Sequence, residues 1–513
     1  MPRQLAAPPS TVAQSTVMSL SRPSSTALSP MGHLAHFQHK ELAMKMESGS
    51  VFIPGIYENQ LSKRQKINEG QDIISNLPDF IIGHILSFLS AKDAVRTSVL
   101  SKRWICLWTF ITKLRFGDRD HNSSPKKSKS SFLNFVYRVL HHLDSSSIES
   151  FSLTISEKYN ACHVSKWISS AIDRSVKKVG VYSRKELNLS FHSLFKCQSL
   201  EELVWMMDCC VSIVPVPSFS YCLSSLTVLK LSGITFSCCN SNGPKFSNGP
   251  KFLTLSFPVL RKYETKNCTW SDVKGVTLDV PLLEVVSIEY KPVLLCASSY
   301  TKIKFCAPRL TEFTYIGYIL PDTLVLDLSK AHIASAKIVP YKYADDTVEE
   351  TGILACNFLR QFNANVECLK LQPSKFLAHA KDFVEDLPSF EMLSHLELDI
   401  VTGEILLALL QKTPSLKTLV LKRIIQFDME LLNSASVPDC FLSTLEMVKF
   451  GNFHGNEHEL NLAKFLMENT LVLERLSVFP TWMLFGLNLE NAKEKLFSFR
   501  KSSNLAIIEI CTV

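Results

Sequence analysis

The sequence predicts an α/β repeat protein, in which a solenoid of parallel strands and short helices follows a small helical unit and a disordered leader. Two observations lead to this fold class. The pattern apolar-x-x-apolar-x-apolar recurs from Ile148 to the C-terminus, and a dense helical pattern lies before it at 72–116. One such repeat cannot bury its apolar face alone, so its copies must stack into a continuous core.

The composition agrees with a globular or repeat protein. The 513 residues are 46% hydrophobic, and the formal net charge of +7 is spread along the chain. No run of about eighteen apolar residues occurs, so no membrane span is expected. Fifteen scattered cysteines without a CxxC pair favour mostly buried free thiols in a reducing compartment, and the expected location is the nucleus or the cytoplasm.

Residues 1–68 are predicted to be a disordered leader. They are rich in Ser, Pro, Ala and Thr, and no acidic residue precedes Glu41. An organelle transit peptide shares this bias, but Arg3 and Arg22 are too few arginines for one. The run KRQK at 63–66 is a weak match to a nuclear localisation signal.

The helical unit is expected to span residues 69–116. Asn76 is a candidate N-cap, and Pro78 lies near the first helical position, where its missing N–H costs nothing. A first helix of about three turns would carry a wide apolar stripe. A second helix is expected at 91–98 and a third from Ser101. The stripe of the first helix is Ile81, Ile82, Ile85, Leu86, Phe88 and Leu89, and the third helix carries Trp104, Leu107 and Trp108.

So much apolar surface on three short helices needs a packing partner. The unit is either a small domain packed on its own chain or a docking module that leaves apolar residues for another protein. LPD at 77–79, HILSFL at 84–89, KDAVRTSVLSKRW at 92–104 and LW at 107–108 resemble a plant F-box. Two residues depart from the family pattern: Phe80 replaces the usual acid, and Ser90 replaces the usual proline.

This resemblance implies that the unit binds a Skp-type adaptor and, through it, a cullin ubiquitin-ligase scaffold. Each residue carried over can alternatively fill the unit's own core; contact is favoured for Pro78 and Trp104, because buried aromatic anchors dominate such interfaces. The adaptor-binding residues implied by position are Leu77, Pro78, Ile82, Ile85, Leu86, Leu89, Val95, Val99, Leu100, Ser101, Trp104 and Trp108.

A polar linker is expected at 117–131, as a solvated loop. The repeat region, 132–436, would begin with a helix that caps the open end of the solenoid. The apolar face of this helix comprises Phe132, Phe135, Val136, Val139, Leu140 and Leu143.

The repeats are spaced like leucine-rich repeats. From Ile148 to Leu473 the intervals average about 27 residues, within the range of about 20–29 for that class. Each interval leaves room for a strand, a turn and a short helix, as at 164–172 and 405–410. A tandem SNGPKF at 241–252 lengthens one interval. The central apolar residues of the copies are Phe151, Val179, Leu203, Leu229, Tyr263, Val286, Phe313, Ala336, Leu369, Leu396, Leu419, Val448, Leu476 and, in a last copy, Ile508.

Residues 437–513 are expected to form C-terminal repeats that cap the solenoid. VPDCFLSTLE at 437–446, a strand ending near Phe450, a Gly/Asn loop, a helix through Phe465 and a strand at 473–479 resemble the FBD motif of plant F-box proteins. The resemblance assigns no chemistry to this region.

No catalytic constellation stands out, so the chain is predicted not to be an enzyme and to need no cofactor. GxSxG, GxxxxGK[ST], GxGxxG and HExxH are all absent. His454, Glu457 and His458 are spaced as metal ligands on a helix would be, but Gly455 and Asn456 break that turn. The expected structure there is a solvated loop without a metal.

Function is therefore expected to reside in surfaces. Side chains between the apolar anchors of each strand should point away from the core. Their mixed charges suit a protein target rather than nucleic acid, which needs a uniformly basic groove. The candidate target-binding residues are Val204, Met206, Lys230, Lys262, Glu264, Glu289, Glu312, Thr314, Lys337, Lys370, Glu397, Asp399, Lys422, Lys449 and Arg475.

From about residue 70 onward the chain resembles the plant F-box/LRR/FBD family. That resemblance implies the substrate-recognition subunit of a Skp-cullin-F-box ubiquitin ligase. One alternative is a leucine-rich-repeat interaction scaffold without ubiquitin transfer. A small-molecule hormone co-receptor is a weaker alternative, because the motifs of the known hormone receptors of this class are absent.

Overall fold

The computed structural model describes the chain from residue 74 to residue 511, except for short segments of which 216–222, 238–251 and 292–300 are the longest. The leader, the basic run at 63–66 and nearly all of the duplicated SNGPKF loop lie outside the described residues. No helix of the described part is long and apolar enough to cross a membrane.

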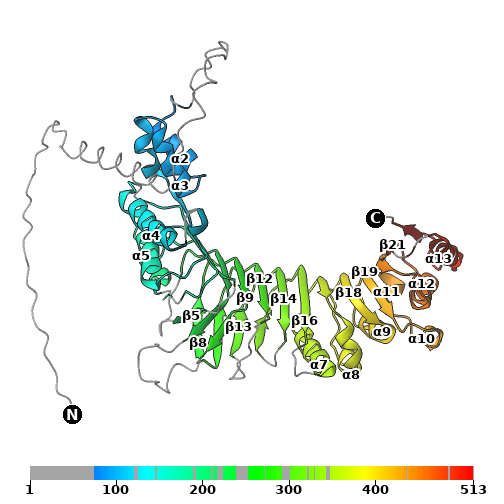
Figure 1. The fold of residues 1–513 in the computed structure, drawn as a ribbon. Coiled ribbons are helices and arrows are strands. Elements are labelled where there is room, and N and C mark those ends of the chain that lie inside the picture. The colour runs from blue at the N-terminus through cyan, green and yellow to red at the C-terminus, as the bar shows by residue number, and fades with distance from the viewer. Residues whose placement is uncertain are drawn as a thin grey trace, which may run out of the picture. The chain divides into compact units, whose positions relative to one another are not determined.

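Fifteen strands of the described chain form one continuous parallel sheet, in which they follow one another in chain order (Figure 1). A leucine-rich-repeat solenoid has this topology, so the predicted fold class is confirmed. The strands are β1 (Lys113–Gly117), β2 (Ser150–Ile155), β3 (Lys178–Ser183), β4 (Glu202–Met207), β6 (Val228–Ser232), β9 (Lys262–Lys266), β12 (Val285–Tyr290), β14 (Glu312–Tyr318), β16 (Ser335–Tyr341), β17 (Cys368–Leu371), β18 (His395–Thr402), β19 (Thr418–Ile425), β20 (Met447–Phe453), β21 (Arg475–Pro480) and β22 (Ile507–Ile510).

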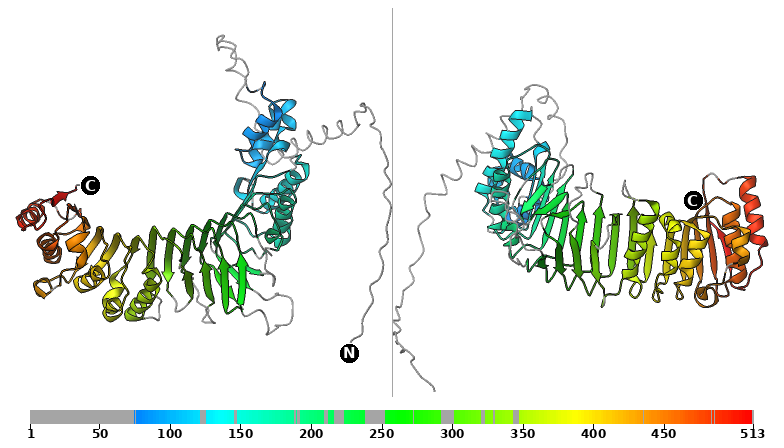
Figure 2. Two further views of the ribbon diagram at one scale, coloured as in Figure 1. Left: turned by 180° about the vertical axis from the view of Figure 1, so that it is seen from behind. Right: turned by 90° about the horizontal axis from the view of Figure 1, so that it is seen from below.

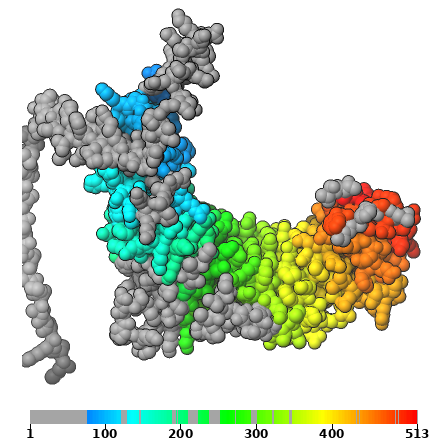
Figure 3. Space-filling model, viewed as in Figure 1, coloured from blue at the N-terminus to red at the C-terminus, as the bar shows by residue number. Residues whose placement is uncertain are grey.

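The register of the sheet confirms the repeat alignment at every copy. Phe151 lies opposite Val179, Val179 opposite Leu203, and the same row continues through Leu476 to Ile508. The side chains of this row are at most 7% exposed. In the space-filling view the colours succeed one another along the repeats (Figure 3), as expected where each repeat packs mainly on its neighbours.

Helices cover one face of the sheet in the early and the late repeats. The predicted helices at 164–172 and 405–410 are confirmed as α5 (Ala161–Ile172) and α9 (Gly403–Gln411). Seen from below, the helices of the late repeats lie side by side against the sheet (Figure 2). The other helical segments of the repeats are α6 (His192–Phe195), α7 (Val348–Leu359), η5 (Arg360–Phe362), η6 (Lys375–His379), α8 (Lys381–Glu385), α10 (Met429–Ser434), α11 (Asp439–Ser443) and α12 (Glu457–Asn469).

In the middle repeats, strands replace the helices that the sequence analysis expected after each turn. The segments FLTLS, GVTLD and KIKFC alternate apolar and polar residues as strands do, and LVLD pairs alongside KIKFC. One parallel sheet contains β8 (Phe252–Ser256), β11 (Gly275–Asp279), β13 (Lys302–Cys306) and β15 (Leu324–Asp327). A second contains β5 (Ser212–Pro215), β7 (Ile234–Ser237) and β10 (Thr269–Ser271).

Two residues with positive φ turn the chain from the long sheet into the three-stranded sheet. Gly233 (φ 67°) separates β6 from β7, and Asn267 (φ 50°) separates β9 from β10. Gly and Asn are the residues that adopt this conformation most readily. The Asn267 side chain also accepts a hydrogen bond from the Lys291 amide at 2.7 Å, which ties this corner to the next repeat.

Helix α4 (Pro125–His142) contains the predicted apolar face, but it begins inside the segment expected to be a solvated linker. It is also not the cap at the open end. It connects β1 to β2 and packs against α5, so it belongs to the helix layer. The sheet also contains a strand before the first predicted repeat, which began at Ile148. This strand is β1, and its Leu114 lies opposite Phe151 of β2.

The helices of the helical unit are shorter than the sequence pattern predicted. Helix α2 (Asp79–Leu86) has Pro78, and not Asn76, at its N-cap, because its first turn starts after the proline. Helix α3 (Ala91–Arg96) continues into the 3₁₀ turn η1 (Thr97–Val99). The expected third helix is two 3₁₀ turns, η2 (Arg103–Ile105) and η3 (Leu107–Phe110).

The unit is joined directly to the first repeat. The Ser87 hydroxyl accepts a hydrogen bond from the Thr112 amide at 3.2 Å. The Thr112 carbonyl in turn accepts hydrogen bonds from the amides of Glu149 and Ser150, at the start of β2. A further 3₁₀ turn, η4 (Asp118–Asp120), follows β1. The helical unit therefore packs partly on its own chain.

The C-terminal region continues the solenoid. The predicted strand, Gly/Asn loop, helix and second strand are β20, residues 454–456, α12 and β21. However, β21 does not end the sheet, because α13 (Leu487–Ser498) and β22 follow it and β22 pairs with β21. The predicted last copy around Ile508 is thus the edge of the sheet, and the segment at 437–480 is interior to it rather than its cap.

Candidate docking surfaces

Four of the residues predicted to bind an adaptor are large apolar side chains that face solvent. Ile85 is 46% exposed, Leu89 38%, Val99 63% and Leu100 64%. We call these four residues the exposed apolar group. Pro78 and Ser101 are also exposed, and Leu77 and Trp104 are half-buried. The helical unit thus leaves apolar side chains over after it has packed on its own chain.

The other four predicted contact residues lie in the interior of the unit. Ile82, Leu86, Val95 and Trp108 are at most 4% exposed. Their side chains fill the core because α2 folds back onto η3. For these four the alternative interpretation as core residues therefore describes the structure, and they hold the exposed apolar group in place.

A polar clamp joins the beginning of the unit to its end. The Arg103 guanidinium donates to the Asp79 carboxylate, with its Nε at 3.0 Å and its Nη2 at 2.7 Å, and Nη2 also donates to the Leu77 carbonyl. The clamp fixes the entry to α2 beside η2. Since both charged side chains are partly solvent-exposed, we attribute orientation to it rather than a large stability contribution.

The two departures from the family pattern have different consequences. Ser90 is the N-cap of α3, where its hydroxyl accepts a hydrogen bond from the Asp93 amide at 3.1 Å. Ser90 therefore stabilises the start of α3 by a side-chain hydrogen bond, whereas a proline at this position would do so by fixing the backbone angle φ. Phe80 is 70% exposed and adds apolar surface next to Asp79.

Two further aromatic side chains of this unit are exposed, which the sequence pattern did not predict. Phe88 belongs to the apolar stripe, yet it is exposed, with its ring 5.2 Å from the Lys113 ammonium. Phe110 is exposed at the end of η3. Apolar periodicity alone cannot distinguish them from core residues; only the early end of α2, at Leu86, places Phe88 outside the helix.

The second candidate surface is the face of the long sheet opposite the helices, which we call the open face. Helices α7, α8 and α9 lie along the other face (Figure 1). Of the predicted target-binding residues, Glu312 and Arg475 are exposed and the others are half-buried, except Val204, which is buried. Val204 lies between Gly180 and Lys230 on the adjacent strands, so it contributes little surface.

Charges on the open face are neutralised locally between β6 and β12. Glu264 lies 3.0 Å from Lys230 and 2.8 Å from Lys262. Glu289 lies 3.3 Å from Lys266 and 3.8 Å from Lys291. Burial acts to raise the pKa of Glu264, but the hydrogen bonds from its two lysines outweigh it and lower the pKa overall. This part of the open face is an ion-pair network with its own partners.

The segment around His454 is anchored, contrary to the expected solvated loop. Glu459, 1% exposed, accepts hydrogen bonds from the amides of His454 and Gly455, both at 2.8 Å. Asn456 caps α12 through the Glu459 amide, and burial raises the pKa of Glu459. The His458 Nδ1 accepts a hydrogen bond from the Phe427 amide at 3.2 Å. The two histidines are thus used separately, and no cluster of three or more His, Cys, Asp or Glu side chains suited to a metal occurs in the described part.

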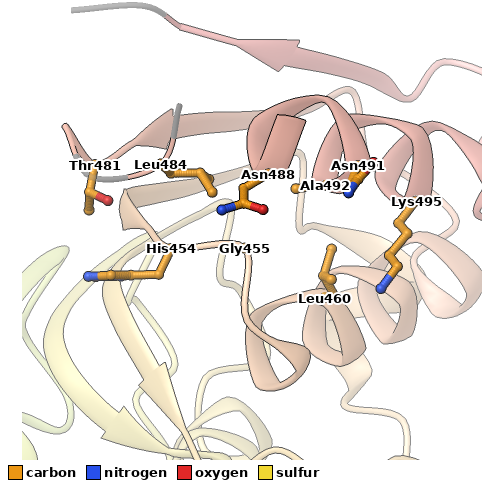
Figure 4. Close-up of a pocket in the computed structure, with 9 residues that line it drawn as sticks. All are labelled: His454, Gly455, Leu460, Thr481, Leu484, Asn488, Asn491, Ala492 and Lys495. Atoms are coloured by element: carbon orange, nitrogen blue, oxygen red, sulfur yellow. The ribbon is translucent and has the colours of Figure 1, made fainter. Parts of the chain in front are cut away.

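A cavity of about 320 Å³ opens beside this segment, between α12 and α13 (Figure 4). Its walls are mixed: Leu460, Leu484 and Ala492 are apolar, whereas the other lining side chains are polar. The polar lining residues are His454, Thr481, Asn488, Asn491 and Lys495. One wall of the cavity is formed by α13, which follows the segment that resembles the FBD motif.

The described cysteines are less buried than expected. Cys197, Cys356 and Cys440 are buried, Cys162 is exposed, and the other described thiols are half-buried. Burial raises the pKa of Cys356 and of Cys440 to about 12, so both stay protonated and unreactive at neutral pH. The adjacent pairs at 209–210 and 238–239 lie outside the described residues.

Two known protein families match segments of this chain. The F-box domain family matches residues 74–113, which is the helical unit together with the start of β1. The FBD family matches residues 433–478, which runs from α10 into β21. Both matches agree with the segments whose residues carried the resemblance.

Several curated plant proteins are similar over most of the chain. An F-box/FBD/LRR-repeat protein of Arabidopsis thaliana is 28% identical over 429 residues, which cover 80% of this chain and 89% of that protein. An F-box/LRR-repeat protein of the same plant is 29% identical over 428 residues, covering 77% and 68%. An FBD-associated F-box protein, also from Arabidopsis thaliana, is 26% identical over 426 residues, covering 79% and 87%.

Proposed function

Because this chain is an F-box protein with a C-terminal FBD region, we propose that it is the substrate-recognition subunit of a Skp-cullin-F-box ubiquitin ligase. F-box domains in general bind a Skp-type adaptor, and F-box/FBD proteins are typically non-catalytic adaptors. The F-box would dock on the Skp-type adaptor, and the solenoid with its FBD region would hold a protein target for ubiquitination.

The exposed apolar group is the observation that carries this proposal. Val99 and Leu100 are almost two-thirds exposed although the unit has a well-packed interior around Trp108. An apolar side chain gains about 1.5–3 kcal/mol when it is fully buried, so a partner that covers these four residues would gain several kcal/mol. Such a surface suits a constant apolar partner.

The contribution of this chain to ubiquitin transfer would be positional. A target held on the solenoid sees a high effective concentration of the ubiquitin-charged enzyme without any catalytic residue in this chain. The ligase and its targets would meet in the nucleus or the cytoplasm.

The test is co-purification of a Skp-type adaptor with the full chain and with Val99→Asp/Leu100→Asp. We expect the wild type to retain the adaptor and the double variant to lose it, because two charges would be buried without partners. Leu442→Asp/Leu471→Asp is the matched control, since these two residues are exposed near the other end of the solenoid. Undiminished binding by the Val99/Leu100 variant would overturn the proposed interface.

The same preparation distinguishes the alternatives. A chain that binds the adaptor but assembles no ubiquitin-transferring complex with a cullin would be an interaction scaffold. A rise in unfolding temperature with a plant hormone would instead indicate a small-molecule co-receptor.

A further inference from the structure

Lysines stack on the open face between β16 and β20 without enough carboxylates to neutralise them. Lys337 and Lys370 lie directly opposite each other on adjacent strands. Like charges in this position repel and lower the stability of a sheet. The neighbour of Lys337 on its other side is Thr314, which offers no charge. This pair therefore breaks a rule of sheet packing that the rest of the open face obeys.

The ion pairs of this region leave two lysines over. Lys370 lies 3.4 Å from Glu397, and that carboxylate also accepts a hydrogen bond from Gln372 at 2.7 Å. Among the described residues, neither Lys337 nor Lys449 lies within 4.0 Å of a carboxylate oxygen. Lys449 has uncharged neighbours, Val420 and Ser477, in its row of the sheet.

The lysines also act on a neighbouring histidine. Burial lowers the pKa of His395, at the start of β18, and the charges of Lys370 and Lys449 lower it further, while Glu397 acts in the opposite direction. The exposed acids Glu367 and Glu446 precede the row of lysines by three residues, about 10 Å along the strands. In the middle of the strands β16 to β20, the only carboxylates are Glu397 and Asp399 of β18.

We propose that the open face of β16–β20, with Lys337, Lys370 and Lys449 as its charged contacts, binds an extended acidic peptide segment of the target protein. This inference rests on the proposed function and names the chemistry of its target. The three lysines occupy one row that runs across the strands. At about 4.8 Å per strand, the row from β16 to β20 spans about 19 Å, the length of about six extended residues. Alternate acidic side chains of such a segment would face the lysines.

The ion pairs between β6 and β12 make that part of the open face a poorer binding site than β16–β20. Between β6 and β12, Glu264 and Glu289 each contact two lysines, so an incoming carboxylate would have to displace an existing partner. Lys337 and Lys449 have no ion pair among the described residues to give up. The acidic peptide would therefore gain charge pairs at Lys337 and Lys449 without displacing an ion pair of the described residues, whereas at Lys370 it would share the lysine with Glu397.

The experiment measures fluorescence anisotropy of a labelled peptide of alternating Glu and Ser, about ten residues long, with the full chain in complex with its adaptor. Alternating Gln and Ser serves as the uncharged peptide. We expect Lys337→Ala/Lys449→Ala to weaken binding of the acidic peptide about tenfold, since the loss of each partly exposed charge pair should weaken binding about threefold. Salt should weaken binding to the wild type more than to the variant.

Lys302→Ala/Lys412→Ala is the control, because it removes the same net charge outside the open face, from β13 and from the end of α9. Equal loss in both variants would show attraction by net charge alone and would overturn the proposal. Absence of binding to the acidic peptide, or tighter binding of a single-stranded RNA of equal charge that depends on the same lysines, would overturn it too. The adaptor should be retained in every variant, so failure of the peptide test leaves the docking of the F-box untouched.

Discussion

The helical unit and the open face of the solenoid present opposite kinds of surface. The helical unit exposes Ile85, Leu89, Val99 and Leu100, which have no polar atoms in their side chains. The open face exposes lysines and carboxylates, many of them paired across adjacent strands. The first surface gains free energy by excluding water, whereas the second selects a partner by charge.

This difference suits two different tasks. An apolar surface binds strongly without much discrimination, so it fits a partner that is always the same. A charged row tolerates many sequences and can be altered one residue at a time without loss of the core, because its side chains point away from it. The two surfaces should therefore respond independently to substitution.

The largest effect is expected from a core residue far from the helical unit. Phe465 of α12 packs its ring against Phe427 and Phe441 at centroid distances of 5.9 and 5.6 Å. Phe465→Ala should lower the free energy of unfolding by about 3–5 kcal/mol, through lost burial and a cavity. Urea denaturation measures this loss, and adaptor binding at a temperature where the variant stays folded should be unchanged.

Phe497→Ala is the matched control, because this phenylalanine is exposed on α13. It should change the free energy of unfolding by no more than about 0.5 kcal/mol. Loss of adaptor binding in folded Phe465→Ala would show that the repeats and the helical unit are energetically coupled, and would break the separation of the two surfaces.

An intermediate effect is expected from the buried carboxylate of Glu459. Its removal in Glu459→Ala leaves the amides of His454 and Gly455 without their acceptor, which should cost about 2–3 kcal/mol of unfolding free energy. The neighbouring Glu457 is exposed, so Glu457→Ala should leave stability nearly unchanged. Equal stability of the two variants in urea would contradict the anchoring role of Glu459.

The smallest effect concerns the pKa of His395. Because its folded pKa lies below the ordinary value, the unfolded chain takes up the proton more readily, and stability should fall as the pH drops through the ordinary histidine range. Lys449→Ala should raise this pKa, since it removes a nearby positive charge. Lys337→Ala should leave it unchanged, because Lys337 is not among the charges acting on His395. An NMR titration of the His395 ring measures both, and an unshifted pKa in Lys449→Ala would contradict a positive field from that lysine.

The strands of the long sheet were predictable because their signal is repeated and local. Each copy places three apolar side chains at fixed spacing, and even the irregular copy around Tyr263 pairs in register with its neighbours. Ile234 at the start of β7 and Ile424 near the end of β19 are fully buried as well. Of the strands in the long sheet, only β1 was not predicted, because its sequence KLRFG directly follows the apolar pattern of the helical unit.

The second layer was harder to predict. A stripe with helical period identifies α5 and α9, but the short segments at 252–256 and 275–279 are compatible with either class until their partners are known. The exposure of individual apolar residues was not predictable either. Leu86 and Leu89 are equivalent in the sequence pattern, yet one is buried and the other exposed, since α2 ends between them.

Hydrogen exchange of the adaptor complex compared with the free chain tests the central claim most directly. We expect slower exchange of the amides at 85–89 and 99–101 on adaptor binding, and unchanged exchange in β16–β20, because the apolar and the charged surfaces serve different partners. Protection of β16–β20 by the adaptor, or unchanged exchange at 99–101, would contradict this division.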